Sequence, residues 1–358
     1  MRWHDALGAG YGIVMTTHTG GSEAGHVGPC AVVAGASRGL GLLVSAELVA
    51  RGYRVRGGAR DRAELDRARR LIESGPVGAR SETVTGSFVG DVCDVSDAAA
   101  VDAWVAQVAR DEGRIDVAIH VAGIIQVGPV ESTTLGHFRA AVDTMLMGPV
   151  HLCIAVLPKM LAAGSGRIGV VSSVGGVVPV PHLLPYSVAK FGAAALTEGL
   201  RSELAGTGVT STTIIPGLMR TGGHLNAQFV GDAARDYAWF APAASLPGLS
   251  VSGRRAARRI VDAVLAGRAQ VELTPLTWVG RRVHGVAPGM TSRVLGLVAR
   301  ALPRGAQVGP SMSRETPHVV GARARAELGS KVVDALSILG DRAARRHNEL
   351  SDPPGRDG

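Results

Sequence analysis

The chain has 358 residues, of which 46% are hydrophobic, 19% are charged and 4% are aromatic. These proportions exclude an intrinsically disordered protein and predict a core built mainly from aliphatic side chains and alanine. The net charge of +8 reflects 38 basic residues, of which three are lysines and 35 are arginines. Because aromatic residues do not alternate with the basic ones, as they do on base-stacking surfaces, we expect no nucleic-acid partner.

Residues 1–28 lack the apolar stretch of a signal peptide, so we expect a flexible lead-in and consider Met15 as an alternative start. The three cysteines have no metal-ligand spacing and are expected to be small buried residues in a reducing compartment. Residues 168–189 are uncharged over a membrane-spanning length, but the glycines and prolines within them predict a buried strand and a loop. We therefore expect a cytoplasmic protein.

Between residues 29 and 275, short apolar segments alternate with amphipathic helical patterns. Strands are predicted at 30–34, 53–57, 87–93, 115–121, 167–173, 209–215 and 270–274. Helices are predicted at 40–51, 61–72, 98–111, 135–162, 186–205 and 253–266. This alternation predicts one catalytic domain with a doubly wound α/β Rossmann fold, in which a mostly parallel seven-stranded sheet has helices on both faces. Ligands of such folds bind at the carboxyl ends of the strands.

Residues 276–358 follow a different pattern and predict a basic, helical C-terminal extension. Residues 318–348 are predicted to form one amphipathic helix with an apolar stripe of Leu328, Val332, Val333, Leu336 and Leu339. The polar residues 351–358 predict a disordered end. We expect the extension to pack on its own domain or on a neighbouring subunit. Its basic amphipathic character is also compatible with a peripheral membrane contact.

The first chemical motif is a glycine-rich turn that follows the first predicted strand and opens a helix. Its candidate cofactor-binding residues are Gly35, Ser37, Arg38, Gly39, Leu40 and Gly41. Glycines permit the tight turn and let backbone N–H groups approach a pyrophosphate at the positive end of the helix. The surrounding strand–helix–strand pattern favours a dinucleotide site over an ordinary glycine-rich turn.

The end of the second strand indicates which dinucleotide binds. An NAD site carries an acid there that bonds the ribose 2′-hydroxyl, whereas residues 53–60 contain none. Arg60 at the tip of the strand and Arg38 in the glycine turn are suited to a 2′-phosphate. In so arginine-rich a chain, either residue alone is also compatible with a solvated surface position. Together they favour NADP(H).

Three further residues predict the reaction. Tyr186 and Lys190 are four residues apart on one face of a predicted helix, and Ser173 ends the fifth strand. Taken singly, a buried tyrosine and a strand-end serine are common structural residues. As a set at the carboxyl edge of the sheet, they indicate a catalytic site.

On these motifs, residues 30–274 resemble the short-chain dehydrogenase/reductase family, in the branch with Gly-x-x-x-Gly-x-Gly and Tyr-x-x-x-Lys. The resemblance implies an NADP(H)-dependent enzyme that interconverts an alcohol and a carbonyl. It assigns Tyr186 as acid/base, Lys190 as the residue that lowers the pKa of Tyr186 and binds the nicotinamide ribose, and Ser173 as the residue that polarises the carbonyl. It also implies a further set of cofactor contacts: Asp94, Val95, Ala122, Gly123, Pro216, Gly217 and Thr221.

The chain departs from the family pattern in two segments. His120 and Val121 stand where the family has two asparagines before Ala122 and Gly123. Met145 stands where a helix asparagine usually holds the water of a proton relay to the lysine, and Asp143 lies on another helix face. These departures argue against the usual relay and leave the hydride step unaffected.

Residues 222–252 follow the Pro-Gly turn, and in the family this segment covers the substrate. Its large apolar residues suggest an apolar, fairly bulky carbonyl or alcohol unless they only pack a lid: Leu225, Phe229, Tyr237, Trp239, Phe240, Leu246 and Leu249. Family members commonly form dimers or tetramers through two long central helices, so a homo-oligomer is expected. One alternative is a catalytically impaired NADP-binding or scaffold protein of the same fold. Another is an NADP-dependent enzyme acting on a carbon–carbon double bond or a sugar nucleotide.

Overall fold

The structure is a computed structural model that describes residues 28–75, 86–305 and 310–350. The predictions of a flexible lead-in, apart from Gly28, and of a disordered end at 351–358 fall outside these residues.

Seven parallel strands form the central sheet, in the order β11-β7-β6-β4-β1-β2-β3. They are β1 (Cys30–Ala34), β2 (Arg54–Ala59), β3 (Ser87–Val92), β4 (Val117–His120), β6 (Gly166–Val171), β7 (Val209–Ile215) and β11 (Gln270–Glu272). Every residue of β1 is buried, as expected of a central parallel strand. The predicted doubly wound α/β fold is confirmed.

Helices cover both faces of the sheet. On one face lie α1 (Gly39–Ala50), α2 (Arg62–Glu73) and α8 (Gly253–Leu265). On the other lie α3 (Ala98–Glu112), α5 (Gly148–Ala162) and α6 (Leu184–Glu203). Successive β1 residues alternate between the two cores, with Ala31 and Val33 in one and Val32 in the other. The three cysteines are free and buried, as predicted.

The predicted helix over 135–162 contains an irregularity. It consists of α4 (Leu135–Val142), a π-helical turn (Asp143–Met147) and α5. This run is also long and apolar enough to cross a membrane, and 44% of its most apolar window is buried. Because α5 packs on α3 and on the sheet, it serves here as a core helix. Single π turns occur often at functional sites, and this one carries Met145.

A second layer of small elements stands beside the carboxyl edge of the sheet. The short strands β5 (Gln126–Val127), β9 (Gln228–Phe229) and β12 (Val319–Val320) form one sheet, while β8 (Leu218–Arg220) pairs with β10 (Ser250–Ser252). Two 3-10 turns, Val130–Ser132 and Val174–Gly176, and helix α7 (Ala233–Ser245) complete this layer. Phe229, Tyr237 and Phe240 are buried in a core cluster of their own.

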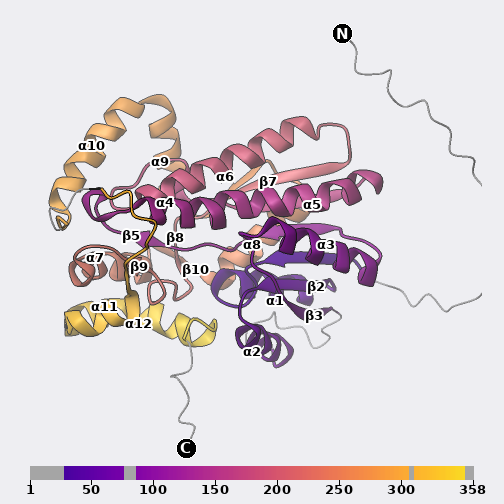
Figure 1. Cartoon of the computed structure of the whole chain (residues 1–358), viewed down its shortest axis with the longest axis horizontal. Helices are drawn as coiled ribbons and strands as arrows, with labels where there is room; N and C mark the ends of the chain where they lie inside the picture. Colours follow the sequence, from indigo (N-terminus) through magenta and orange to yellow (C-terminus); the bar gives the residue numbers. More distant parts are fainter. Residues whose placement is uncertain (1–27, 76–85, 306–309, 351–358) are drawn as a thin grey trace, which may run out of the picture.

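In the described part of the C-terminal extension, four helices form two separate pairs (Figure 1). The first pair is α9 (Pro275–Val286) and α10 (Pro288–Ala301), and the second is α11 (Gly321–Leu328) and α12 (Lys331–Arg346). The prediction of a single helix over 318–348 is therefore wrong. Gly329 adopts a left-handed conformation with φ 58° and ends α11, and Ser330 caps α12.

The apolar stripe predicted for this region is also largely exposed, because α12 buries a different face. Its buried residues are small: Ser337, Gly340, Ala343 and Ala344. They let α12 approach α7 closely, since a Cβ on Gly340 would lie 2.7 Å from Cε1 of His224 and would overlap Ser245 Oγ. Leu336 and Val332, from the predicted stripe, are 42% and 69% exposed.

Candidate active site

The fold brings Ser173, Tyr186 and Lys190 together. Ser173 follows β6, and the other two residues lie in the first two turns of α6. The Ser173 side chain is hydrogen-bonded to the Tyr186 phenol, and its Oγ accepts a bond from the Gly175 N–H at 3.1 Å. The Lys190 Nζ lies 5.8 Å from the centroid of the Tyr186 ring. The three predicted catalytic residues therefore form one cluster at the carboxyl edge of the sheet.

Burial governs the protonation of this cluster. The Lys190 side chain is buried, its Nζ donates to the Val171 carbonyl at 2.6 Å, and burial lowers its pKa to about 7. Burial raises the pKa of Tyr186, against the opposing hydrogen bond from Ser173. The expected lowering of the tyrosine pKa also depends on the positive charge of a bound nicotinamide, so it stays a prediction. In the protein alone, burial outweighs the favourable contact with Ser173.

The glycine turn is packed so tightly that its glycines are required. Gly35 has φ 86°, and a Cβ there would lie 2.5 Å from the Ala122 N atom. A Cβ on Gly41 would overlap the Gly35 carbonyl oxygen. The turn presents the first N–H groups of α1, which have no partner within the helix. These observations fit a pyrophosphate-binding turn, and Leu40, whose side chain is buried in the core, anchors it.

The family model for short chain dehydrogenases matches residues 29–228. The chain belongs to the short-chain dehydrogenase/reductase family. The predicted resemblance is thereby confirmed.

Relatives and solved structures agree with this assignment. The D-threitol dehydrogenase of Mycolicibacterium smegmatis is 31% identical over 54% of this chain and 71% of its own length. Dehydrogenase/reductase SDR family member 7B of Danio rerio is 31% identical over 57% of this chain, and the match spans 65% of the fish protein. A variant of the actinorhodin polyketide ketoreductase, solved with NADPH, superimposes with a TM-score of 0.59 at 26% identity, covering 70% of this chain and 97% of the reductase.

The two departures from the pattern of short-chain dehydrogenases place a buried histidine and a buried methionine in the candidate site. Burial lowers the pKa of His120 to about 3, and its Nε2 has no hydrogen-bond partner within the described residues. Met145 is 1% exposed, and its Sδ would lie 3.3 Å from a Cβ placed on Gly123. A thioether is a weak acceptor and no donor, so this side chain holds no relay water.

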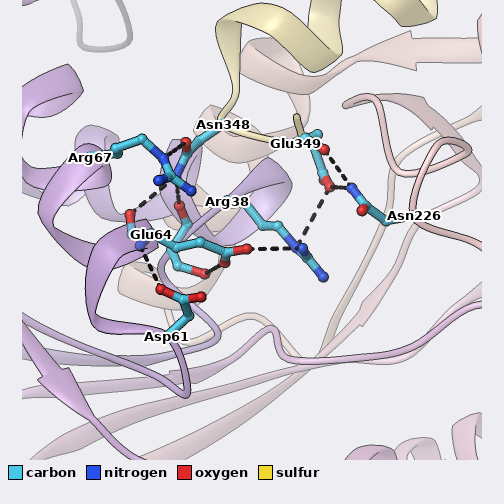
Figure 2. A network of polar contacts seen from close by, with 8 residues as sticks. Arg38, Asp61, Glu64, Arg67, Asn226, Asn348 and Glu349 are labelled. Carbon is cyan, nitrogen blue, oxygen red and sulfur yellow. Dashed lines mark hydrogen bonds and ion pairs between the residues drawn. The ribbon is translucent and has the colours of Figure 1, made fainter. Parts of the chain in front are cut away.

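The adenosine end of the candidate cofactor site contains an acid that sequence reasoning missed. Arg38 pairs with Glu64 at 3.2 Å, and Glu64 also accepts a bond from the Ser37 hydroxyl at 2.8 Å (Figure 2). Glu64 lies in the first turn of α2 rather than at the end of β2. Its signal was present, since Asp61 followed three residues later by Glu64 is the pattern of a helix start.

Arg60 and Asp94, two predicted cofactor contacts, lie close enough for the arginine charge to act on the carboxyl. Arg60 is exposed just beyond β2. Burial opposes ionisation of Asp94, but two bonds from Ser96 and the charge of Arg60 outweigh it and lower the pKa of the carboxyl. Val95 is buried beside Gly148.

The predicted segment after β7 lies next to Ser173. The Pro216 carbonyl accepts a bond from the Val174 N–H at 2.7 Å, and a Cβ on Gly217 would lie 2.5 Å from Thr274 Oγ1. The Thr221 carbonyl lies 3.2 Å from Nδ1 of His347, near the end of the chain. This segment therefore joins the catalytic set to the C-terminal extension.

Residues 347–349 of the extension lie directly on the glycine turn, a contact that no motif in the sequence predicts. The Gly39 N–H donates to the His347 carbonyl at 2.8 Å, and the Asn348 side-chain amide donates to the Ser37 carbonyl at 2.8 Å. Glu349 lies 3.7 Å from Arg38 and accepts a bond from Asn226 at 2.7 Å (Figure 2).

Proposed function

We propose that this short-chain dehydrogenase uses NADP(H) to interconvert an alcohol and a carbonyl, with Tyr186 as the acid/base. The observation that carries the proposal is the hydrogen-bonded pair of Ser173 and Tyr186 beside a buried Lys190, at the sheet edge that bears the glycine turn. The solved ketoreductase with NADPH, which has the same fold, supports it.

When bound, the cofactor supplies the hydride, and the chain supplies the proton. The raised pKa of Tyr186 keeps its phenol protonated at neutral pH, as a proton donor to a carbonyl oxygen must be. Ser173 Oγ, already bonded to that phenol, is suited to bond the same substrate oxygen as negative charge develops on it. Lys190, with a pKa of about 7, exchanges a proton near neutrality behind the tyrosine ring.

The preference for NADP(H) rests on Arg38 and Arg60 and on the absence of an acid along β2. The competing observation is Glu64, which engages Arg38 and which offers an acceptor that a ribose 2′-hydroxyl could use. Dissociation constants for NADPH and NADH distinguish the two. We expect wild type to prefer NADPH and the Arg38→Ala/Arg60→Ala variant to lose about tenfold in that preference. A wild-type preference for NADH would contradict the assignment.

We further propose an apolar, fairly bulky substrate. The buried aromatic side chains after β7 do not support this, because Phe229, Tyr237 and Phe240 pack into their own cluster. The support comes from Ile124, which is only partly buried and packs in the same cluster as Tyr186. An apolar ketone bound at the phenol would cover this side chain.

A homo-dimer or homo-tetramer through α5 and α6 is also proposed. Large apolar side chains are exposed on these helices, among them Ile154 at 65%, Leu161 at 44%, Val188 at 45% and Phe191 at 38%. Exposed apolar side chains of this kind usually mark a surface that becomes buried when subunits associate. Light scattering should show an oligomer that the Ile154→Glu variant lowers toward the monomer, and an unchanged mass would contradict this interface.

The reaction is tested with NADPH and a panel of apolar ketones, followed by absorbance. We expect turnover by wild type, and its loss in Tyr186→Phe with NADPH affinity kept within a few fold. Turnover that survives without the phenol hydroxyl would remove Tyr186 as the acid. Cofactor binding without any wild-type turnover would favour the alternative of an NADP-binding scaffold protein. His120 and Met145, which replace family asparagines, are compatible with that alternative.

A further inference from the structure

Residues 347–349 hold the glycine turn through backbone and side-chain bonds to three different elements. The Asn348 amide nitrogen donates to the carbonyls of Ser37, at 2.8 Å, and Glu64, at 3.1 Å. Its amide oxygen accepts a bond from Arg67 at 3.1 Å. Both the main-chain and side-chain oxygens of Glu349 accept bonds from Asn226 at 2.7 Å (Figure 2).

These contacts use the groups that a dinucleotide would need. The Gly39 N–H, at the start of α1, is occupied by the His347 carbonyl. The carboxyl of Glu349 is packed against the same glycine, where a Cβ on Gly39 would overlap its Oε1. A helix N-terminus attracts anions, so this carboxyl takes the position suited to a phosphate group. Arg38, the candidate for the 2′-phosphate, faces both Glu64 and Glu349.

We propose that residues 347–349 are a built-in competitor of the cofactor, which must leave the glycine turn before NADP(H) can bind. The proposal rests on the proposed NADP(H) site. The Gly39 N–H and the closely packed surface of this glycine cannot bind residues 347–349 and NADP(H) at the same time, so the two exclude each other. The segment is joined to α12 at Arg346 and is held mainly by polar contacts, which water or a phosphate can replace.

The test compares three proteins by NADPH affinity, measured from fluorescence. One lacks residues 347–358, which begin immediately after α12, and the matched control lacks only 351–358. Because binding to a site that is open only part of the time is weakened by the open fraction, we expect the longer deletion to bind NADPH at least about tenfold more tightly than full-length protein. The control deletion should bind as full-length protein does. Thermal unfolding verifies that each protein is folded, and Asn348→Ala/Glu349→Ala serves as a second variant.

A second readout is independent of affinity. Trypsin cleavage after Arg346 should become faster on addition of NADPH to the full-length protein, because the segment is released. Equal NADPH affinity in all three proteins, or weaker binding after the longer deletion, would contradict the proposal that residues 347–349 compete with the cofactor. If none of the proteins binds NADPH or NADH, the proposed cofactor site fails together with it.

A separate surface, formed by α9 and α10, carries a second inference. No residue of α10 is buried, and its packing partner is α9. Met290, Val294 and Leu297 lie on successive turns of α10 and are 57%, 54% and 62% exposed. On α9, Val286 is 89% exposed. The helix pair, which lies at the edge of the molecule (Figure 1), therefore exposes an apolar stripe along α10 and further apolar side chains on α9.

The charges beside this stripe all have one sign. No acidic residue occurs between Glu272 and Glu315, whereas six arginines do. Arg281 and Arg282 are paired with Glu272. Arg293 and Arg300 lie two turns apart beside Leu297, and no acidic partner occurs for either among the residues the structure describes. An apolar stripe flanked by unpaired arginines has the character of a helix that lies in the headgroup region of an anionic bilayer.

We infer that the α9–α10 pair docks the enzyme on an anionic lipid surface. Vesicles of phosphatidylcholine with one-third phosphatidylglycerol should sediment the protein, and pure phosphatidylcholine should not. Arg293→Glu/Arg300→Glu should abolish the sedimentation. Arg69→Glu/Arg323→Glu, which makes the same change in charge at two exposed arginines elsewhere, should retain it.

Added salt should release the bound protein, because it screens the arginines. Sedimentation that does not depend on phosphatidylglycerol, or that survives the change of Arg293 and Arg300, overturns the docking. A dimer that forms without lipid and dissociates in the same variant identifies a second copy of the chain as the occupant instead, and also overturns it.

Discussion

The carboxyl of Glu349 makes the competition with cofactor depend on pH. Burial, together with the charge of Glu64, raises its pKa from 4.5 to about 7, against the opposing charge of Arg38 and the bond from Asn226. The segment therefore takes up a proton when it docks. Its docking is fully stabilised below the ordinary pKa of the carboxyl and loses that stabilisation as the pH rises through 7.

The magnitude follows from the two pKa values. Between about pH 6 and about pH 8, a group that moves from 4.5 to about 7 on docking weakens the docked state by about 1.4 kcal/mol, or about tenfold. Glu349→Gln removes this contribution and leaves the rest of the segment in place. The ratio of NADPH dissociation constants, wild type over Glu349→Gln, should thus fall about tenfold across that range.

Measuring a ratio isolates one group. His347, whose pKa is lowered by burial, and the phosphates of NADPH titrate alike in both proteins and cancel. The exposed Glu327→Gln on α11 serves as the control and should give a ratio that does not change with pH. A ratio for Glu349→Gln that is flat, or that rises with pH, would refute the reasoning.

Three stability predictions follow from buried groups, each checked by chemical unfolding. Arg56 is 5% exposed and holds Asp91 through two bonds of 2.9 Å, so Arg56→Ala should cost about 3–5 kcal/mol by leaving the partly buried Asp91 without its charge partner. A cost below about 1 kcal/mol would contradict this. The Tyr237 hydroxyl is buried with no hydrogen-bond partner among the described residues, so Tyr237→Phe should change stability by less than about 1 kcal/mol, and a large loss would reveal a missed partner. Gly41→Ala should destabilise by about 1–3 kcal/mol and weaken NADPH binding, because its Cβ meets the Gly35 carbonyl; unchanged binding would show that the turn can relax.

The central sheet and its covering helices between residues 29 and 275 were predicted well because each of these elements has a local periodic signal. The short strands β5, β8, β9 and β10 and helix α7 were not predicted. Every predicted element there lies within two residues of its observed bounds. The break between α11 and α12 was missed although Gly329 and Ser330 are ordinary stop and start residues. The apolar stripe predicted the wrong buried face for α12. The face that packs on α7 consists of small residues, because the two helices approach closely.

The candidate site could be predicted from the sequence only where the functional residues are close together along the chain. Tyr186 and Lys190 share a helix face, so their neighbourhood follows from local geometry. The contact of Asn348 with Ser37 spans 311 residues and has no periodic signal. The protonation state of Tyr186 likewise depends on burial, which spacing does not reveal.

The separation between Ser37 and Asn348 also sets an order of events in the cell. At about 5–20 residues per second, the ribosome adds the second of these residues about 15–60 s after the first. During translation, the nucleotide-binding half thus exists for a time without the peptide that later covers it. A newly made chain meets the cellular pool of dinucleotides before it meets its own carboxyl end.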